Sequence, residues 1–178
     1  MAETRTAAHS AIAIRRWDEV ARPDQLGAAL DAIFFEASGT KSFASEEVRA
    51  AFRERWLGRY LVQHPQWAYL AMAPDGTIAG YLVGALGEGS GFDDFATAAQ
   101  QYPAHLHVNL APHYRSQGIG AELIEAFAKD AARAGAKGMH VVTSADARNM
   151  RFYERVGFQP RARTTVNGRE LVFLGRRL

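Results

Sequence analysis

The spacing of apolar positions changes along the chain and predicts its secondary structure. Apolar side chains recur every three or four residues in 23–37, 43–63 and 118–135, as on one face of an α-helix. A short helix is expected again over 147–157, ended by a glycine. In 104–110 polar and apolar residues alternate, which is typical of a β-strand.

Short apolar runs bounded by turn residues predict the other strands. They are a strand at 11–17, a hairpin at 66–86 around Pro-Asp-Gly, a strand at 138–144 and a hairpin at 161–178 around Asn-Gly. The resulting order is strand, two helices, hairpin, strand, helix, strand, helix, hairpin. This order predicts one mixed α/β domain over 11–178, with a parallel crossover in its second half. Residues 1–10 are small and polar, and we expect them to be a flexible terminus.

The segment 87–103 breaks this pattern. It is rich in glycine and long for a connection between two strands. It is either a functional loop, in which Glu88, Asp93 and Asp94 attract a cationic amine, or a mobile surface loop whose acids are solvated.

The composition narrows the classes of protein and partner. A chain of 178 residues suits one domain with its own core, and the lack of cysteine excludes disulfides and cysteine-based metal sites. The formal net charge is only +2, with acids and bases interspersed, so nucleic acid is not an expected partner. Because no apolar run approaches the ~20 residues of a membrane span and the N-terminus is a poor signal peptide, we expect no membrane contact and a cytoplasmic location.

Residues 113–123, His-Tyr-Arg-Ser-Gln-Gly-Ile-Gly-Ala-Glu-Leu, place two glycines where a helix begins. The first turn of a helix has N–H groups without helical acceptors and carries the positive end of the helix dipole. Glycine there lets an anion approach the backbone without a Cβ in the way. The segment matches neither the dinucleotide fingerprint nor the P-loop. The glycines either cap the helix, or they form a turn that binds a diphosphate through Arg115 and the amides of about 117–121.

Two motifs within 104–158 resemble those of the GCN5-related N-acetyltransferase (GNAT) family. Residues 115–121, Arg-Ser-Gln-Gly-Ile-Gly-Ala, are similar to its acetyl-CoA-binding motif, and 152–158, Phe-Tyr-Glu-Arg-Val-Gly-Phe, to a helix that follows about thirty residues later. The resemblance implies a single-domain GNAT-like fold: a mixed, mostly antiparallel sheet with a central parallel crossover and helices on both faces. It also implies acetyl-CoA as the acetyl donor. The segment 102–120 further resembles a branch that includes the acetyltransferase-like domain of O-GlcNAc hydrolases, in which the catalytic activity of some members is in doubt.

The resemblance implies roles for individual residues. The backbone of Leu110 would contact the pantetheine arm and stabilise the developing oxyanion, and Tyr153 would protonate the departing thiolate unless it only packs on the sheet. The family usually has Asn where Asp146 stands here, so Asn149 could take over that contact with the cofactor arm. The cofactor-binding residues expected on this basis are Leu110, Arg115, Ser116, Gln117, Gly118, Ile119, Gly120, Ala121, Asn149 and Tyr153.

Two histidines are candidate bases for an amine substrate, which must lose a proton before it attacks. His105 and His107 share one face of the 104–110 strand with Asn109, although a central strand covered on both sides is normally apolar on both. A cleft on that face would make either histidine a general base. The alternative is two structural histidines under 87–103. A metal pair is a third interpretation, but it lacks a third ligand at suitable spacing, so we expect no metal.

These residues together predict an acyltransferase that moves an acetyl group from acetyl-CoA onto a primary amine of a small molecule or protein. Direct attack is expected because no cysteine can carry the acetyl group. The alternative is a module that binds acetyl-CoA without transferring it. No motif in the sequence identifies the acceptor. A homodimer is one possible oligomeric state, because dimers are common in proteins resembling this one.

Overall fold

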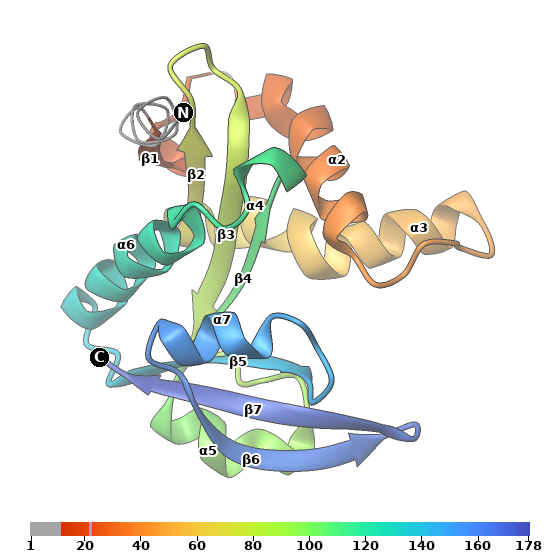
Figure 1. Cartoon of the computed structure of the whole chain (residues 1–178), viewed down its shortest axis with the longest axis vertical. Helices are drawn as coiled ribbons and strands as arrows, with labels where there is room; N and C mark the ends of the chain where they lie inside the picture. The colour runs from red at the N-terminus through yellow and green to blue at the C-terminus, as the bar shows by residue number, and fades with distance from the viewer. Residues whose placement is uncertain (1–11, 22) are drawn as a thin grey trace. The chain divides into compact units, whose positions relative to one another are not determined.

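A computed structural model describes residues 12–21 and 23–178 of the chain (Figure 1). The terminus expected at 1–10 lies outside the described residues. The strands are β1 (Ala13–Arg16), β2 (Ala68–Met72), β3 (Ile78–Leu86), β4 (Ala104–Leu110), β5 (Gly138–Ser144), β6 (Gln159–Val166) and β7 (Arg169–Arg177). The α-helices are α2 (Gly27–Ala37), α3 (Glu46–Arg53), α4 (Arg59–Gln63), α5 (Ala96–Gln101), α6 (Ile119–Arg133) and α7 (Met150–Arg155).

The strands form a mixed sheet in the order β1-β2-β3-β4-β5-β7-β6. β4 and β5 are parallel, with Ala104 opposite Met139, and α6 is the crossover between them. The pairs β1–β2, β2–β3, β5–β7 and β6–β7 are antiparallel. The α/β fold class predicted from the sequence, including its parallel crossover, is therefore confirmed.

The described residues divide into two compact units. The first comprises the described residues up to Val83 together with His107–Phe127, and the second comprises Gly84–Leu106 and Ala128–Leu178. Each unit therefore contains two separate stretches of the chain, and each is described by itself.

In the first unit, β2 and β3 form the hairpin that the Pro-Asp-Gly turn predicted. The backbone N–H of Thr77 donates to Asp75 Oδ1 at 2.9 Å, and Gly76 has a φ of 86°, a value that glycine adopts without strain. α2 buries Leu30, Ile33 and Phe34, as its helical spacing predicted.

The helix expected over 43–63 is present but not regular. Ser45 caps α3 by accepting a hydrogen bond from the N–H of Val48 at 3.3 Å. A π-helical turn at Glu54–Gly58 then separates α3 from α4 and inserts an extra residue into the helical repeat. The apolar spacing expected to face the core does not hold at the start of α3, where Val48 is 49% exposed.

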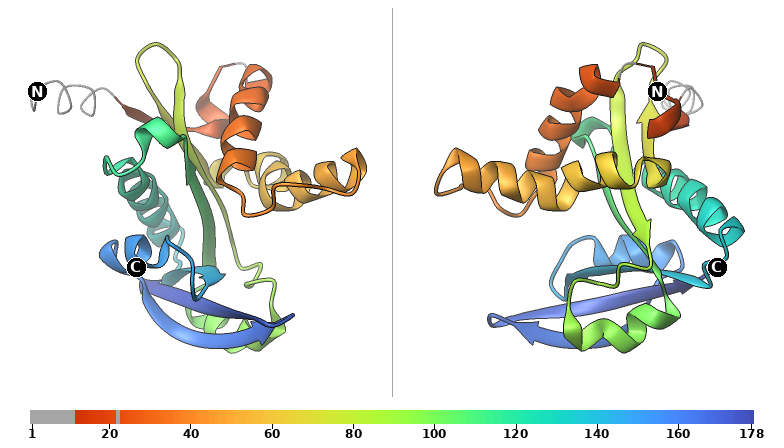
Figure 2. Two further views of the ribbon diagram at one scale, coloured as in Figure 1. Left: turned by 45° about the vertical axis from the view of Figure 1, so that its right-hand side comes forward. Right: turned by 180° about the vertical axis from the view of Figure 1, so that it is seen from behind.

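In the second unit, β5, β7 and β6 form the sheet, with α7 on one face and α5 on the other (Figure 2). Asn167 and Gly168 connect β6 to β7 with φ angles of 51° and 76°. Two positive φ angles in a two-residue loop define the type I′ hairpin that Asn-Gly predicted.

Part of the segment 87–103, which the sequence predicted as a loop, is helical. Its second half forms a 3-10 turn at Asp93–Phe95 followed by α5. Phe95 and Tyr102 are buried, and their rings lie 5.5 and 6.1 Å from the ring of Phe173 on β7. These aromatic contacts anchor α5 to the sheet.

The helix α6 follows its predicted pattern closely. The stripe of Ile119, Leu123, Phe127 and Ala131 is fully buried. The helix ends in a Schellman motif, because Ala136 N donates to Ala131 O at 3.0 Å and Gly135, with a φ of 91°, occupies the C′ position.

Candidate functional site

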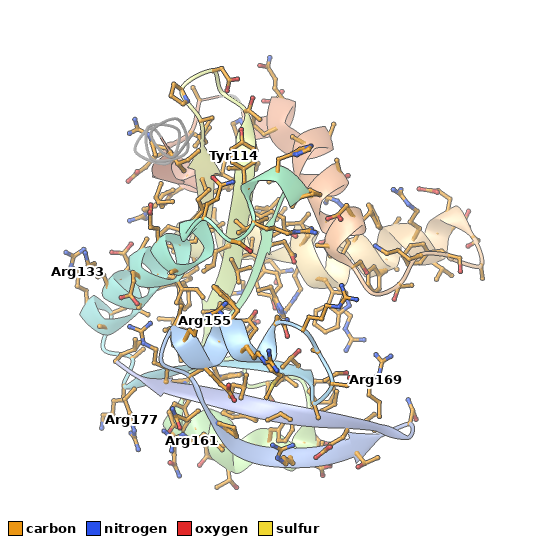
Figure 3. The ribbon with its side chains drawn as sticks, viewed as in Figure 1. Tyr114, Arg133, Arg155, Arg161, Arg169 and Arg177 are labelled. Atoms are coloured by element: carbon orange, nitrogen blue, oxygen red, sulfur yellow. The ribbon has the colours of Figure 1, made fainter. Side chains whose placement is uncertain are left out.

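The glycine turn between β4 and α6 lies wholly within the first unit. A 3-10 turn at Pro112–Tyr114 precedes it, and Figure 3 labels Tyr114. Ser116 and Gly118 have φ angles of 61° and 88°. A left-handed residue in such a turn gathers neighbouring N–H groups around an anion-sized concavity. Because Ser116 has a Cβ, its conformation costs about 1 kcal/mol, which is consistent with a turn built for a ligand.

The first turn of α6 continues this row of amides. Glu122 N donates to Gly118 O at 3.1 Å, so the helical hydrogen bonds start there. The earlier N–H groups of Ile119, Gly120 and Ala121 have no carbonyl one turn before them within the helix. Such amides at the positive end of a helix dipole suit the oxygens of a diphosphate. The turn thus fits the pyrophosphate part of acetyl-CoA that the sequence predicted here.

The side chain of Arg115 has partners within the protein. Its Nε donates to Leu110 O at 3.1 Å and its Nη1 to Glu36 Oε1 at 3.3 Å, while Nη2 contacts Glu36 Oε2. Both side chains are 43% exposed. Sequence reasoning identified Arg115 and missed Glu36, because nothing local to the last turn of α2 marks this residue as its partner.

Leu110, the last residue of β4, lies where β3 comes very close to β4. A Cβ at Gly80 would stand 2.7 Å from Asn109 O and would also collide with the Leu110 side chain. Gly80 was not singled out from the sequence, although a glycine inside a strand often marks such a close approach. The side chains of the two strands are also joined, because Asn109 Nδ2 on β4 donates to the buried Tyr81 hydroxyl on β3 at 2.9 Å.

His107 lies in the first unit, in contact with the helical segment that follows α3. Its Nε2 is 3.1 Å from Tyr60 Oη, and its ring meets the Trp56 ring edge-on at 5.3 Å. Arg59 Nη2 donates to Tyr60 Oη at 2.7 Å. In the tautomer of His107 that has no proton on Nε2, Tyr60 Oη is the donor of this hydrogen bond. Tyr60 and Arg59 are additions to the set predicted from the sequence.

His105 belongs to the second unit and is buried, with 8% of its surface exposed. Its ring lies 5.7 Å from that of His140, which stacks on Phe173 at 4.5 Å. His140 Nδ1 is 2.5 Å from Tyr102 O, and burial lowers the pKa of His140 to about 4, partly opposed by this hydrogen bond. The two histidines predicted as one pair therefore have different surroundings.

Tyr153 lies on α7 in the second unit and is buried between Phe152 and Phe158, whose rings are 5.2 and 5.5 Å from its own. Burial raises its pKa well above the usual value for tyrosine. The phenol is therefore protonated throughout the physiological pH range. A group that must give up a proton requires this state.

Asn149, at the N-cap of α7, accepts a hydrogen bond on Oδ1 from Thr143 Oγ1 at 3.0 Å. Its amide nitrogen remains a hydrogen-bond donor, as the predicted contact with a cofactor arm requires. Asp146, which stands where the family usually has Asn, is exposed.

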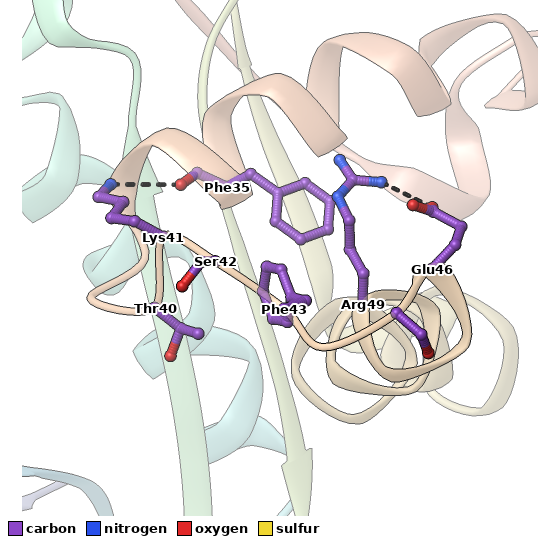
Figure 4. A pocket seen from close by; sticks show the side chains of 8 residues that line it. Phe35, Thr40, Lys41, Ser42, Phe43, Glu46 and Arg49 are labelled. Atoms are coloured by element: carbon purple, nitrogen blue, oxygen red, sulfur yellow. Dashed lines mark hydrogen bonds and ion pairs between the residues drawn. The ribbon is translucent and has the colours of Figure 1, made fainter.

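A pocket of about 490 Å³ lies between the end of α2 and the start of α3 in the first unit (Figure 4). The Arg49 guanidinium covers the Phe35 ring at 3.8 Å and pairs with Glu46 at 3.1 Å. On the other side, Lys41 Nζ donates to Glu36 O at 2.5 Å. The pocket is lined by the last turn of α2, the first turns of α3 and the segment between them.

Within 12–21 and 23–178, no three His, Asp or Glu side chains lie close enough together to hold a metal ion. In the same part of the chain, no helix has the length and apolar character needed to cross a membrane.

The chain matches the model of the Acetyltransferase (GNAT) family over residues 30–158. The protein therefore belongs to this family. The family assignment confirms the class of enzyme predicted from the two sequence motifs, an acetyl-CoA-dependent acyltransferase.

Solved structures show the same fold at low sequence identity. A GNAT-family protein from Desulfovibrio desulfuricans is 22% identical, with a TM-score of 0.66 over 94% of this chain and 99% of that one. The yncA protein of Salmonella typhimurium, solved with its cofactor acetyl-CoA, is 21% identical, with a TM-score of 0.62 over 93% of both chains. An N-acetyltransferase from Staphylococcus aureus Mu50 is 17% identical, with a TM-score of 0.65 over 93% of this chain and 98% of that one. The finer resemblance to the branch of O-GlcNAc hydrolases, the domain boundary at residue 11 and the individual site residues stay predictions.

Proposed function

We propose that the protein transfers the acetyl group of acetyl-CoA by direct attack onto a primary amine of a small molecule or protein. The observation that carries this proposal is the left-handed turn at Ser116 and Gly118, whose amides lead into α6 beside the guanidinium of Arg115. When bound, acetyl-CoA supplies an acetyl group activated as a thioester. Direct attack is the simplest route, because the sequence has no cysteine to form an acyl-enzyme.

In this proposal Tyr153 protonates the departing thiolate. Burial keeps its phenol protonated, since the pKa is raised above the ordinary value near 10. A thiol has a reference pKa near 8.5, so transfer of a proton from a phenol of raised pKa is uphill in water. It becomes useful only where the phenol lies close to the sulfur as negative charge develops there. Tyr153→Phe, which keeps the ring and removes the proton, tests this role by a lower kcat.

His107 is the favoured base, with His105 as the other candidate. An alkylammonium group of reference pKa near 10.4 loses a proton at neutral pH at a cost of about 4–5 kcal/mol, so a base accelerates the reaction. The contact of His107 Nε2 with Tyr60 Oη supports this choice, because it connects the imidazole through Tyr60 to the guanidinium of Arg59. The burial of His105 beside His140 fits a structural role better.

Three finer expectations belong to the same proposal. The pocket between α2 and α3 would contact the acceptor, because it lies in the same unit as the proposed base His107. The protein would be cytoplasmic, which cell fractionation tests. It would form a homodimer, which sedimentation velocity tests.

A turnover assay beside a binding measurement tests the function. Purified protein is incubated with acetyl-CoA and a panel of primary amines and peptides, and free thiol release is followed. Amine-dependent release that Gly118→Asp abolishes supports the proposal. If acetyl-CoA binds tightly but no amine in a broad panel releases thiol, the protein is a binding module instead. If a well-folded protein does not bind acetyl-CoA at all, the site assignment fails as well.

A further inference from the structure

A second pocket, of about 390 Å³, lies in the second unit between α5 and the β6–β7 hairpin. The residues that line it include Asp94, Thr97, Gln101, Tyr102, Arg161 and Arg177. None of them belongs to the glycine turn or to the acid–base residues proposed above. Figure 3 labels Arg161 and Arg177 beside this hairpin.

Two guanidinium groups lie over one aromatic ring in this pocket. The Cζ atoms of Arg161 and Arg177 are 5.5 and 5.2 Å from the centre of the Tyr102 ring. Both distances are within the range of cation–π attraction, which holds each guanidinium near the ring. Two positive charges therefore lie at the same aromatic ring.

The sheet holds the Tyr102 ring in place through two glycines. A Cβ at Gly175 on β7 would stand 2.9 Å from three ring carbons, and one at Gly138 on β5 would stand 2.6 Å from Tyr102 Cδ1. The ring therefore lies directly on the strands and is only 3% exposed. It forms a rigid floor for the two arginines.

The backbone also places both arginines at this floor. The pairing of β6 with β7 shifts between Pro160 and Ala162, which makes Arg161 the extra residue of a β-bulge. Bulges of this kind redirect a side chain and are common next to functional sites. Arg177 follows Gly175 by two positions on β7, so both residues are on the same face of the sheet.

Neither arginine forms an ion pair with a carboxylate in the described part of the chain. Other arginines do, for example Arg163 with Glu170 at 3.0 Å on the same hairpin. Asp94 lines the pocket too, but its Oδ2 accepts a hydrogen bond from Thr164 Oγ1. The pocket thus has two guanidinium groups and one carboxylate, which leaves it net positive, beside two neutral hydrogen-bonding side chains, Thr97 and Gln101.

We propose that this pocket binds a doubly charged oxyanion of the phosphate type, free or as part of a small molecule. The guanidinium groups of Arg161 and Arg177 bind its oxygens with paired N–H donors, as arginine does for phosphate. Thr97 and Gln101 supply further donors. The two guanidinium groups at the Tyr102 ring attract the negative charges of such a ligand. The site is distinct from the proposed acetyl-CoA turn and does not depend on it.

The test is a titration of the ¹⁵N-labelled full chain with inorganic phosphate in the absence of CoA, which itself carries phosphate groups. Sodium chloride at equal ionic strength is the reference. We expect saturable shifts of the Gly138, Gly175 and Tyr102 amides that chloride does not reproduce. Arg161→Gln and Arg177→Gln should each weaken phosphate binding about tenfold or more, because each removes a charged donor pair. Arg169→Gln, at the opposite end of β7, is the matched control and should leave the affinity unchanged.

A parallel titration with glycerol phosphate distinguishes the sources of the anion. Tighter binding of glycerol phosphate than of inorganic phosphate indicates a phosphorylated small molecule, and equal binding indicates free phosphate. Arg177→Lys, which keeps the charge, serves as a second variant if Arg177→Gln lowers the dispersion of the spectrum. Shifts that chloride reproduces, or phosphate binding that the variants at 161 and 177 leave unchanged, would overturn the proposal.

Discussion

Both terminal nitrogens of Arg115 contact the carboxylate of Glu36, a residue 79 positions earlier in the chain. The pair joins the last turn of α2 to the glycine turn within the first unit. A diphosphate bound at this turn must therefore compete with a carboxylate for the same guanidinium. Glu36 thus lowers the net positive charge of the turn that we propose for acetyl-CoA.

Replacement of Glu36 by glutamine should therefore tighten acetyl-CoA binding. Because exposed ion pairs contribute about 0.2–1 kcal/mol, we expect the dissociation constant from calorimetry to fall by up to about fivefold. Glu170→Gln is the matched control, since it breaks the Arg163–Glu170 pair of similar exposure in the second unit. Equal effects of the two variants, or weaker binding by Glu36→Gln, would show that Glu36 does not compete for Arg115.

The two ends of α6 allow a test of the glycine turn that separates backbone strain from ligand contact. Gly118 and Gly135 have φ angles of 88° and 91°, so a side chain costs about 1 kcal/mol or more of stability at either position. Gly118→Asp also places bulk and negative charge at the proposed diphosphate site and should abolish acetyl-CoA binding in calorimetry. Gly135→Asp should lower the melting temperature comparably but bind normally. Unchanged acetyl-CoA affinity in a folded Gly118→Asp variant contradicts the site.

Local patterns explain which parts of this structure could be read from the sequence. The buried stripe of α6 repeats with the helical period, and Asn167-Gly168 favours one hairpin turn, so neither depends on distant residues. The glycine turn could be predicted because its residues, 113–123, are also contiguous in the sequence. The short helix α5 was missed because six residues give too little periodicity, and only the burial of Phe95 on the sheet fixes it.

Contacts between distant residues account for the rest of the candidate site. Tyr60 and His107 are 47 positions apart, and Arg115 and Glu36 are 79 apart. Such pairs are set by how helices pack on the strands, and a single sequence carries no local signal for them. The alternation of the strand predicts that His105 and His107 share one face. It carries no information on their partners, which are His140 for His105 and Tyr60 for His107.

The different surroundings of the two histidines lead to different expected effects of their removal. His107→Ala should lower kcat by about a hundredfold or more, the usual contribution of a general base, without changing acetyl-CoA affinity. His105→Ala should chiefly lower the melting temperature, because it leaves a cavity in the second unit. The measurements are steady-state kinetics with the best amine from the panel, calorimetry and thermal unfolding.

Tyr60→Phe separates positioning of His107 from general destabilisation. It keeps the ring at 5.4 Å from that of His107 but removes the hydroxyl that contacts Nε2. If Tyr60 positions the base, the acidic limb of the pH–rate profile should move, and it should vanish in His107→Ala. His113→Ala, at an exposed position, is the control. Full turnover by the His107→Ala variant would remove this histidine from the mechanism.

His140 predicts how the stability of the protein depends on pH. Burial depresses the pKa of the folded state from 6.5 to about 4, against the raising effect of the hydrogen bond with Tyr102 O. The unfolded chain therefore binds more protons than the folded one between these two values, and stability must fall as the pH drops through this window. Above about pH 6.5 the imidazole is neutral in both states, and the folded state loses no stability through it. Between that pH and about pH 4 the free energy of unfolding should fall by about 3 kcal/mol because of His140 alone.

His140→Phe should flatten this dependence. Phenylalanine preserves the stacking on Phe173 but loses the contact with Tyr102 O, so the variant should be about 1–3 kcal/mol less stable near neutral pH. Urea unfolding at about pH 7 and about pH 4.5 should show a smaller loss for the variant than for the original protein. The exposed His113→Phe variant should keep the original slope, because it does not alter the buried imidazole. Parallel losses of stability in the His140→Phe variant and the original protein would mean that carboxylates, and not His140, cause the acid sensitivity.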